Sequence, residues 1–206
     1  MPARFSIAVL AMFAAIGAHG ETLDRIAATV GRHVISERDV LQDLRIAAFL
    51  DNKPAELSGE QKRKAADRLI DRYLVLEDAA LTRAALPTAA DAAAMLAPVK
   101  ARYGSEREYR GALAQAGITE EELSEHLLGG LRMLRYTDLR FRPEVQLSED
   151  QLRAYYTKLA PAQTFEASRN DIEKLLTDQQ TMQALDRWLG MTRSETAILY
   201  REAVFK

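Results

Sequence analysis

Hydrophobic and polar positions alternate near the start of the chain and then follow helical periodicity. The segment 26–30 alternates, with Ile26 among the inward positions, which is typical of a half-buried strand. Gly31 and Arg32 predict a tight turn with glycine at its first central position, after which 33–35 returns as a second strand. Because a two-stranded hairpin is only marginally stable in water, we expect a third strand to pair with it.

Seven helical segments follow, and six of them begin after a Ser or Thr that can cap the first turn. They are predicted from Ser36 to Leu50, Gly59 to Arg83, Thr88 to Tyr103, Ser105 to Gly117, Thr119 to Phe141, Ser148 to Tyr156 and Phe165 to Arg193. Pro98 predicts a kink or break in the third helix. The tail 196–205 leans toward β-structure and is the predicted third strand. The fold class is therefore mainly α, with a small antiparallel sheet formed by the N-terminal hairpin and the C-terminal strand.

Apolar stripes predict which face each helix buries. The stripe of the 59–83 helix is predicted to reach Leu81. The predicted stripe of the 119–141 helix consists of Leu123, Leu127, Leu131, Leu134 and Asp138. That of the last helix consists of Ile172, Leu175, Leu176, Gln179, Met182, Leu185 and Leu189.

Gly129 and Gly130 are unusual because they lie inside a predicted helix, where each costs about 1 kcal/mol relative to alanine. Two interpretations remain open. The glycines fit a tight helix crossing, and they also fit a bend or the close approach of another polypeptide.

The first twenty residues resemble a secretory leader. Arg4 provides a positive start, 5–17 is apolar, and Ala18 and Gly20 are small residues suited to cleavage before Glu21. We expect residues 1–20 to be a signal peptide and 21–206 to be one exported domain, without stable membrane insertion after cleavage. Within that domain, 21–160 is the predicted helical part and 165–206 the returning helix and strand. The alternative is an uncleaved anchor or a buried first helix.

Composition narrows the function classes. The 206 residues carry 28 Lys plus Arg against 30 Asp plus Glu, a formal charge of -2, which argues against a nucleic-acid partner. The chain contains no cysteine, so it forms no disulfide and receives no lipid at a cysteine.

Catalytic and metal-binding patterns are sparse. His126, with Glu122 one turn before it, is predicted as an ordinary helix-surface pair. The acidic run at 120–122 suits the positive end of a helix. Arg132, Arg135, Arg140 and Arg142 are predicted to form a solvated face. We expect no cofactor, no metal and no catalytic residue.

The order of motifs resembles that of SurA-type periplasmic chaperones. The matching stretches are "LDRIAATVGRHVISERDV" (23–40), "RKAADRLIDRYLVLEDAALTRA" (63–84), "SEREYRGALAQAGITEEELSEHLLGGLRMLRYTDLRF" (105–141), "VQLSEDQLRAYYTK" (145–158) and "EASRNDIEKLLTDQQTMQALDRWLGMTRSETAILY" (166–200). In most relatives, one or two parvulin peptidyl-prolyl isomerase domains precede the last helix. Here only the short stretch between Tyr156 and Phe165 occupies that place, and it is too short to fold as such a domain.

The resemblance implies a periplasmic, ATP-independent chaperone without isomerase activity, whose partners are unfolded exported or outer-membrane proteins. It leaves a homodimer open. The alternative is a non-catalytic partner or structural subunit of an envelope complex that reuses the fold. The candidate residues of a client-binding groove are Met95, Leu127, Gly130, Leu131, Met133 and Leu134.

Overall fold

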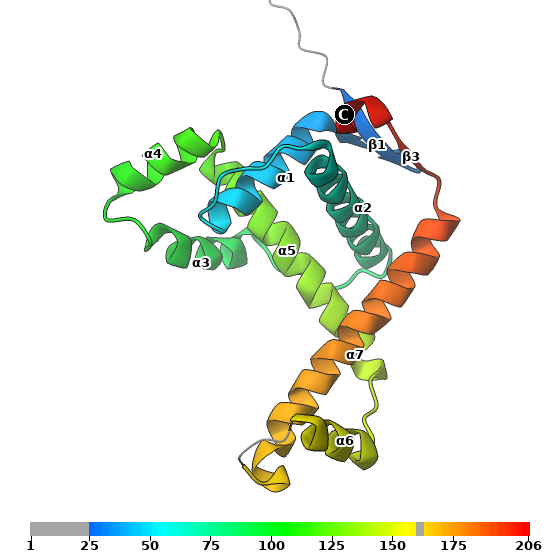
Figure 1. The fold of residues 1–206 in the computed structure, drawn as a ribbon. Helices are drawn as coiled ribbons and strands as arrows, with labels where there is room; N and C mark the ends of the chain where they lie inside the picture. The colour runs from blue at the N-terminus through cyan, green and yellow to red at the C-terminus, as the bar shows by residue number, and fades with distance from the viewer. Residues whose placement is uncertain (1–24, 160–162) are drawn as a thin grey trace, which may run out of the picture.

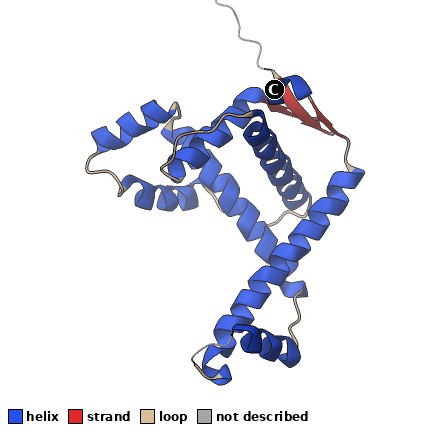
Figure 2. Cartoon of the chain, in the orientation of Figure 1, coloured by secondary structure: helices blue, strands red, loops and turns tan. Residues whose placement is uncertain are grey.

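The computed structural model describes residues 25–159 and 163–206, and the predicted leader lies outside them. The described elements are β1 (Ile26–Val30), β2 (His33–Ser36), α1 (Glu37–Leu50), α2 (Gly59–Leu81), α3 (Ala89–Lys100), α4 (Glu106–Ala116), α5 (Glu120–Phe141), η1 (Arg142–Glu144), α6 (Glu149–Leu159), α7 (Phe165–Glu195), β3 (Ile198–Tyr200) and η2 (Glu202–Phe205). This confirms the mainly helical class with a small antiparallel sheet (Figure 1, Figure 2).

The sheet joins the two ends of the described chain. β1 is the central strand, and β2 and β3 pair with it on either side, both antiparallel. Gly31 takes the predicted place in the turn, with a positive φ of 56°. The expected inward position of Ile26 is wrong, since its side chain is 40% exposed. A register irregularity between Ile26 and Ala28 breaks the strict alternation, and Ala27 and Ala28 are both buried.

The C-terminal segment closes this sheet, but only part of it is a strand. Gly31 N donates to Ala197 O at 2.9 Å and Arg201 N donates to Ala27 O at 2.8 Å, on either side of β3. The chain then turns into η2, whose Val204 is 3% exposed. The predicted strand at 196–205 is therefore confirmed over 198–200 and replaced by a 3₁₀ turn beyond it.

Two contacts attach this segment to α2. Gly59 begins α2 directly beneath η2, and a Cβ atom at position 59 would lie 1.8 Å from Phe205 O. Arg193, near the end of α7, donates to Asp71 at 2.5 Å and to Asp67 at 2.6 Å, both on α2. The long helix and the tail after it are thus both held against α2.

The predicted capping residues determine where the helices begin. Ser36, Thr88 and Thr119 form capping boxes with the acidic residue three positions later. Gly117 ends α4 in the left-handed region, with a φ of 67°. The largest differences are at the C-terminal ends, where α3 stops three residues before the predicted end, Tyr103, and α6 continues three residues past the predicted end, Tyr156. Pro98 lies inside α3, which continues to Lys100.

Buried side chains form three separate clusters instead of one core. The main cluster lies beneath the sheet, between α1, α2, the end of α5 and the second half of α7. A second cluster joins α1, α3, α4 and the start of α5, and a third joins α6 to the first half of α7. Accordingly, α3 and α4 project on one side and α6 lies at the far end of α7 (Figure 1).

This arrangement overturns several predicted core positions. Leu81 is 79% exposed, Leu134 56%, Met182 47% and Leu175 45%. Because the helices diverge from the main cluster, no element within 25–159 and 163–206 covers these positions. Thr137 on α5 and Thr181 on α7 are buried instead, each with its hydroxyl bonded to the carbonyl four residues earlier.

Candidate binding surface on α5

Five of the six predicted groove residues lie on α5, and the sixth, Met95, lies on α3, which packs alongside α5. Their exposure varies, with Gly130, Leu134 and Met95 exposed and Leu127, Leu131 and Met133 half-buried. Leu127 packs against the second cluster and Met133 against the main one. The structure thus places the six residues on two neighbouring helices, and the side chains of Leu127 and Met133 also pack against the buried clusters.

One face of α5 is buried at both ends and open in the middle. Residues spaced by three or four positions share a helix face, and this face carries Leu123, Leu127, Gly130, Leu134, Thr137 and Phe141. Leu123 is fully buried in the second cluster and Phe141 is 5% exposed in the main one. Between them Leu134 is 56% exposed. The middle of α5 therefore bridges two clusters and leaves apolar surface uncovered.

The two glycines of α5 have different surroundings. A Cβ at Gly129 would lie 3.2 Å from the Arg72 side chain of α2, so Gly129 permits a close helix approach. A Cβ at Gly130 would meet nothing within 4 Å. The surroundings of Gly129 thus fit the interpretation as a tight helix crossing, whereas the approach of another polypeptide at Gly130 stays a prediction. We define Leu127, Gly130, Leu131 and Leu134 as the α5 surface.

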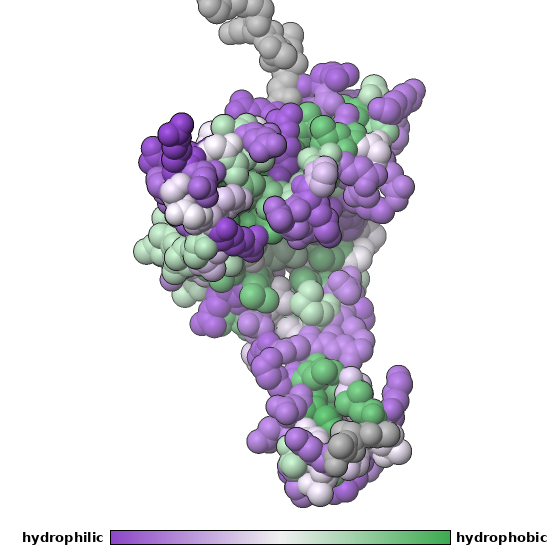
Figure 3. Space-filling view, turned by 60° about the vertical axis from the view of Figure 1, so that its left-hand side comes forward, coloured by the Kyte–Doolittle hydropathy of each residue, from purple (hydrophilic) through white to green (hydrophobic). Residues whose placement is uncertain are grey.

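Further apolar side chains are exposed on α7. Leu175 and Met182 are seven residues apart and share a face, next to the buried line of Thr181 and Leu185. Figure 3 shows apolar side chains at the surface of the main body and again on the arm that α6 and the start of α7 form. Exposed apolar groups are therefore distributed along the molecule.

A charged cluster lies where α1, α2 and α5 meet. The Asp43 side chain is 2% exposed and accepts from Arg68 Nη2 at 2.6 Å. Its second oxygen, Oδ1, lies 3.7 Å from Arg72 and 3.6 Å from His126 Nδ1, and it has no hydrogen-bond partner among the described residues. Asp43, Arg72 and His126 line a pocket of about 240 Å³.

The predicted surface pair of His126 with Glu122 is wrong. Glu122 instead caps α5 through Thr119, and the His126 side chain, 19% exposed, turns toward Asp43. Burial lowers the pKa of His126, and Arg72 lowers it further, while Asp43 acts in the opposite direction. Sequence periodicity cannot find this cluster, because its members come from three helices far apart in the chain.

Three of the four arginines of the predicted solvated face also make specific contacts. Arg132 donates to Pro87 O at 2.9 Å, Arg140 pairs with Asp78, and Arg142 bridges Asp138 and Asp178. Only Arg135 is exposed without such a contact. These arginines join α5 and η1 to neighbouring segments.

Residues 25–159 and 163–206 contain no group of three or more His, Cys, Asp or Glu placed to hold a metal ion. In the same part of the chain, no helix combines the length and apolar character needed to cross a membrane.

Comparison with models of known protein families gives no match to this chain. Comparison with curated proteins gives no match either.

Proposed function

We propose that this protein is an ATP-independent periplasmic chaperone that binds unfolded exported or outer-membrane proteins and has no isomerase activity. The observation that carries the proposal is the open middle of α5, where Leu134 and Gly130 are exposed between two buried ends of one helix face. Apolar surface that stays uncovered between two buried stretches of one helix face offers a place where another polypeptide can bury apolar groups.

The architecture supports weak contacts at several places. Exposed Leu175 and Met182 on α7 and Met95 on α3 add apolar groups beyond the α5 surface. Methionine is flexible and adapts to different partner side chains. A client held by several weak contacts can leave as it folds, without an energy source.

The absence of isomerase activity is proposed from the link between the last two helices. α6 ends at Leu159 and α7 begins at Phe165. The segment between them is far shorter than the roughly 40 residues below which a domain seldom folds alone.

The test is an aggregation assay with an unfolded outer-membrane protein. The full chain should suppress aggregation, and Leu134→Asp should require a several-fold higher concentration for the same effect. Full burial of a leucine contributes about 2 kcal/mol, roughly thirtyfold in affinity at a site that buries it. Leu81→Asp is the matched control, because Leu81 is 79% exposed at the end of α2 and is not part of the α5 surface.

Failure to suppress aggregation at several-fold excess would refute the proposal. Equal loss in the two leucine variants would show that the α5 surface has no special role. A stable complex with one specific protein, together with indifference to unfolded clients, would favour the partner-subunit alternative.

A further inference from the structure

A second cavity, distant from Leu134 in sequence, lies between the end of α1, the loop 51–58 and α4. It has a volume of about 610 Å³, within the range of small-molecule and peptide sites. We call it the α1–α4 pocket.

Part of the wall of this pocket is apolar and combines two aromatic rings with small residues. Phe49 of α1 stacks on Tyr103, with ring centroids 6.1 Å apart and planes 10° apart. Ala112 and Ala116, four residues apart on α4, form the facing wall. Alanine side chains leave room beside the rings, so the pocket can accept an apolar side chain.

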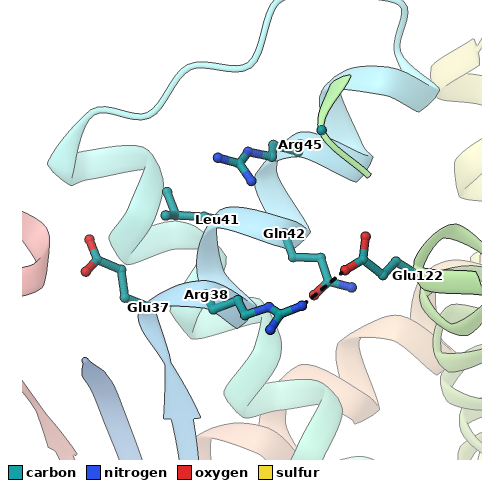
Figure 4. A pocket seen from close by; sticks show the side chains of 7 residues that line it. Glu37, Arg38, Leu41, Gln42, Arg45 and Glu122 are labelled. Atoms are coloured by element: carbon teal, nitrogen blue, oxygen red, sulfur yellow. Dashed lines mark ion pairs between the residues drawn. The ribbon is translucent and has the colours of Figure 1, made fainter. Parts of the chain in front are cut away.

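One cation at the pocket has no partner in the described part of the chain. Arg45 lies one turn before Phe49 on the same face of α1, and no ion pair or hydrogen bond joins it to another described residue. It also lines the neighbouring pocket shown in Figure 4, where both carboxylates are already engaged. Glu37 pairs with Lys62, and Glu122 lies 3.8 Å from Arg38. In Figure 4 the Arg45 guanidinium points away from Glu122.

Lys53 adds a second positive charge, and none of the described lining residues carries a carboxylate. Lys53 lies 3.8 Å from Asp51, with both side chains largely exposed, so this pair is weak. The carbonyl groups at the end of α1 do not need hydrogen bonds from the side chains of Arg45 or Lys53. The last four carbonyls of α1 accept from Asp51 N, Lys53 N, Asn52 N and Arg102 Nη1.

We propose that the α1–α4 pocket binds the carboxyl terminus of a polypeptide that ends in an apolar residue. The terminal carboxylate accepts hydrogen bonds from Arg45 and Lys53, and the last side chain packs on Phe49 and Tyr103. The carboxamides of Asn52 and Gln115, which also line the pocket, can bond the final peptide groups. These amides favour a peptide over a fatty acid, whose tail offers them no partner.

The experiment measures fluorescence anisotropy of the full chain with a labelled hexapeptide, Gly-Ser-Gly-Ser-Ala-Phe, as the free acid and as the carboxyl-terminal amide. The free acid should bind at least about tenfold more tightly, since charge-assisted hydrogen bonds are the strong ones. Arg45→Gln should remove most of that difference, whereas Arg45→Lys should retain part of it. Arg107→Gln is the control, because Arg107 is exposed on α4 and lies outside the pocket.

Equal binding of acid and amide would overturn the proposal, as would an unchanged preference in Arg45→Gln. Dodecanoate that binds more tightly than the free-acid peptide would assign the pocket to lipid anions and also overturn it. The proposal does not depend on chaperone activity. Leu134→Asp, which alters the α5 surface, should leave the preference for the free-acid peptide over the amide unchanged. Filling the pocket with Ala116→Phe should abolish binding while circular dichroism shows a folded chain.

Discussion

Gly59→Ala, which adds a single methyl group, should displace the C-terminal segment η2 from α2. The residue begins α2 beneath η2, and an added Cβ would lie 1.8 Å from the carbonyl oxygen of Phe205 and 2.8 Å from its carbon. Both atoms belong to the backbone, so no side-chain rotation relieves the overlap. Gly59→Ala therefore forces η2 away from α2.

The magnitude follows from what η2 contributes. Exposing Val204 costs about 1.5–3 kcal/mol, and the bond from Lys62 Nζ to Val204 O contributes about 0.5–1.5 kcal/mol. Alanine recovers at most about 1 kcal/mol of helix propensity at this position. The net expectation is a loss of about 1–3 kcal/mol in the free energy of unfolding.

The assay is urea unfolding followed by the fluorescence of Trp188, the single tryptophan, which packs against the main cluster, and by circular dichroism. Gly111→Ala is the control, because a Cβ at that position in α4 meets nothing within 4 Å. It should gain about 0.5–1 kcal/mol. A Gly59→Ala protein as stable as the unaltered chain would refute the reasoning.

Two further predictions concern the same framework. Because the pKa of His126 is lowered in the folded state, the unfolded chain takes up a proton there at a higher pH than the folded chain does, so the free energy of unfolding should fall as the pH drops below 6.5 toward the folded pKa. In urea unfolding measured across this pH range, His126→Gln should lose less stability on acidification than the unaltered chain. An identical dependence of stability on pH in the two proteins would contradict the assignment. Deleting 198–206 removes β3 from the sheet together with η2, and the melting temperature should fall, whereas unchanged melting would contradict the pairing of β3 with β1.

Local signals in the sequence predict the helices and their starts well. Ser36, Thr88 and Thr119 are followed three residues later by Asp or Glu, and a capping box is present at these three positions. The glycine turn at Gly31 and the end of α4 at Gly117 follow from the preference of glycine for positive φ. The third strand was predictable because a hairpin needs a partner and only the tail had strand character.

The candidate surface was predictable only in part. The sequence places Leu134 in an apolar stripe, but the stripe alone does not indicate whether another element covers it. His126 and Arg142 looked like surface residues because their partners, Asp43 and Asp178, come from distant segments.

The sequence by itself determined where helices and strands form, because capping, turn chemistry and periodicity act within a few residues. Only the tertiary structure decided which apolar positions remain open. The three clusters form at separate helix junctions, so α5 is buried at Leu123 and Phe141 and uncovered at Leu134. Likewise, only the tertiary structure shows that Arg45 has no ion pair among the described residues, since Glu37 pairs with Lys62 and Glu122 lies beside Arg38.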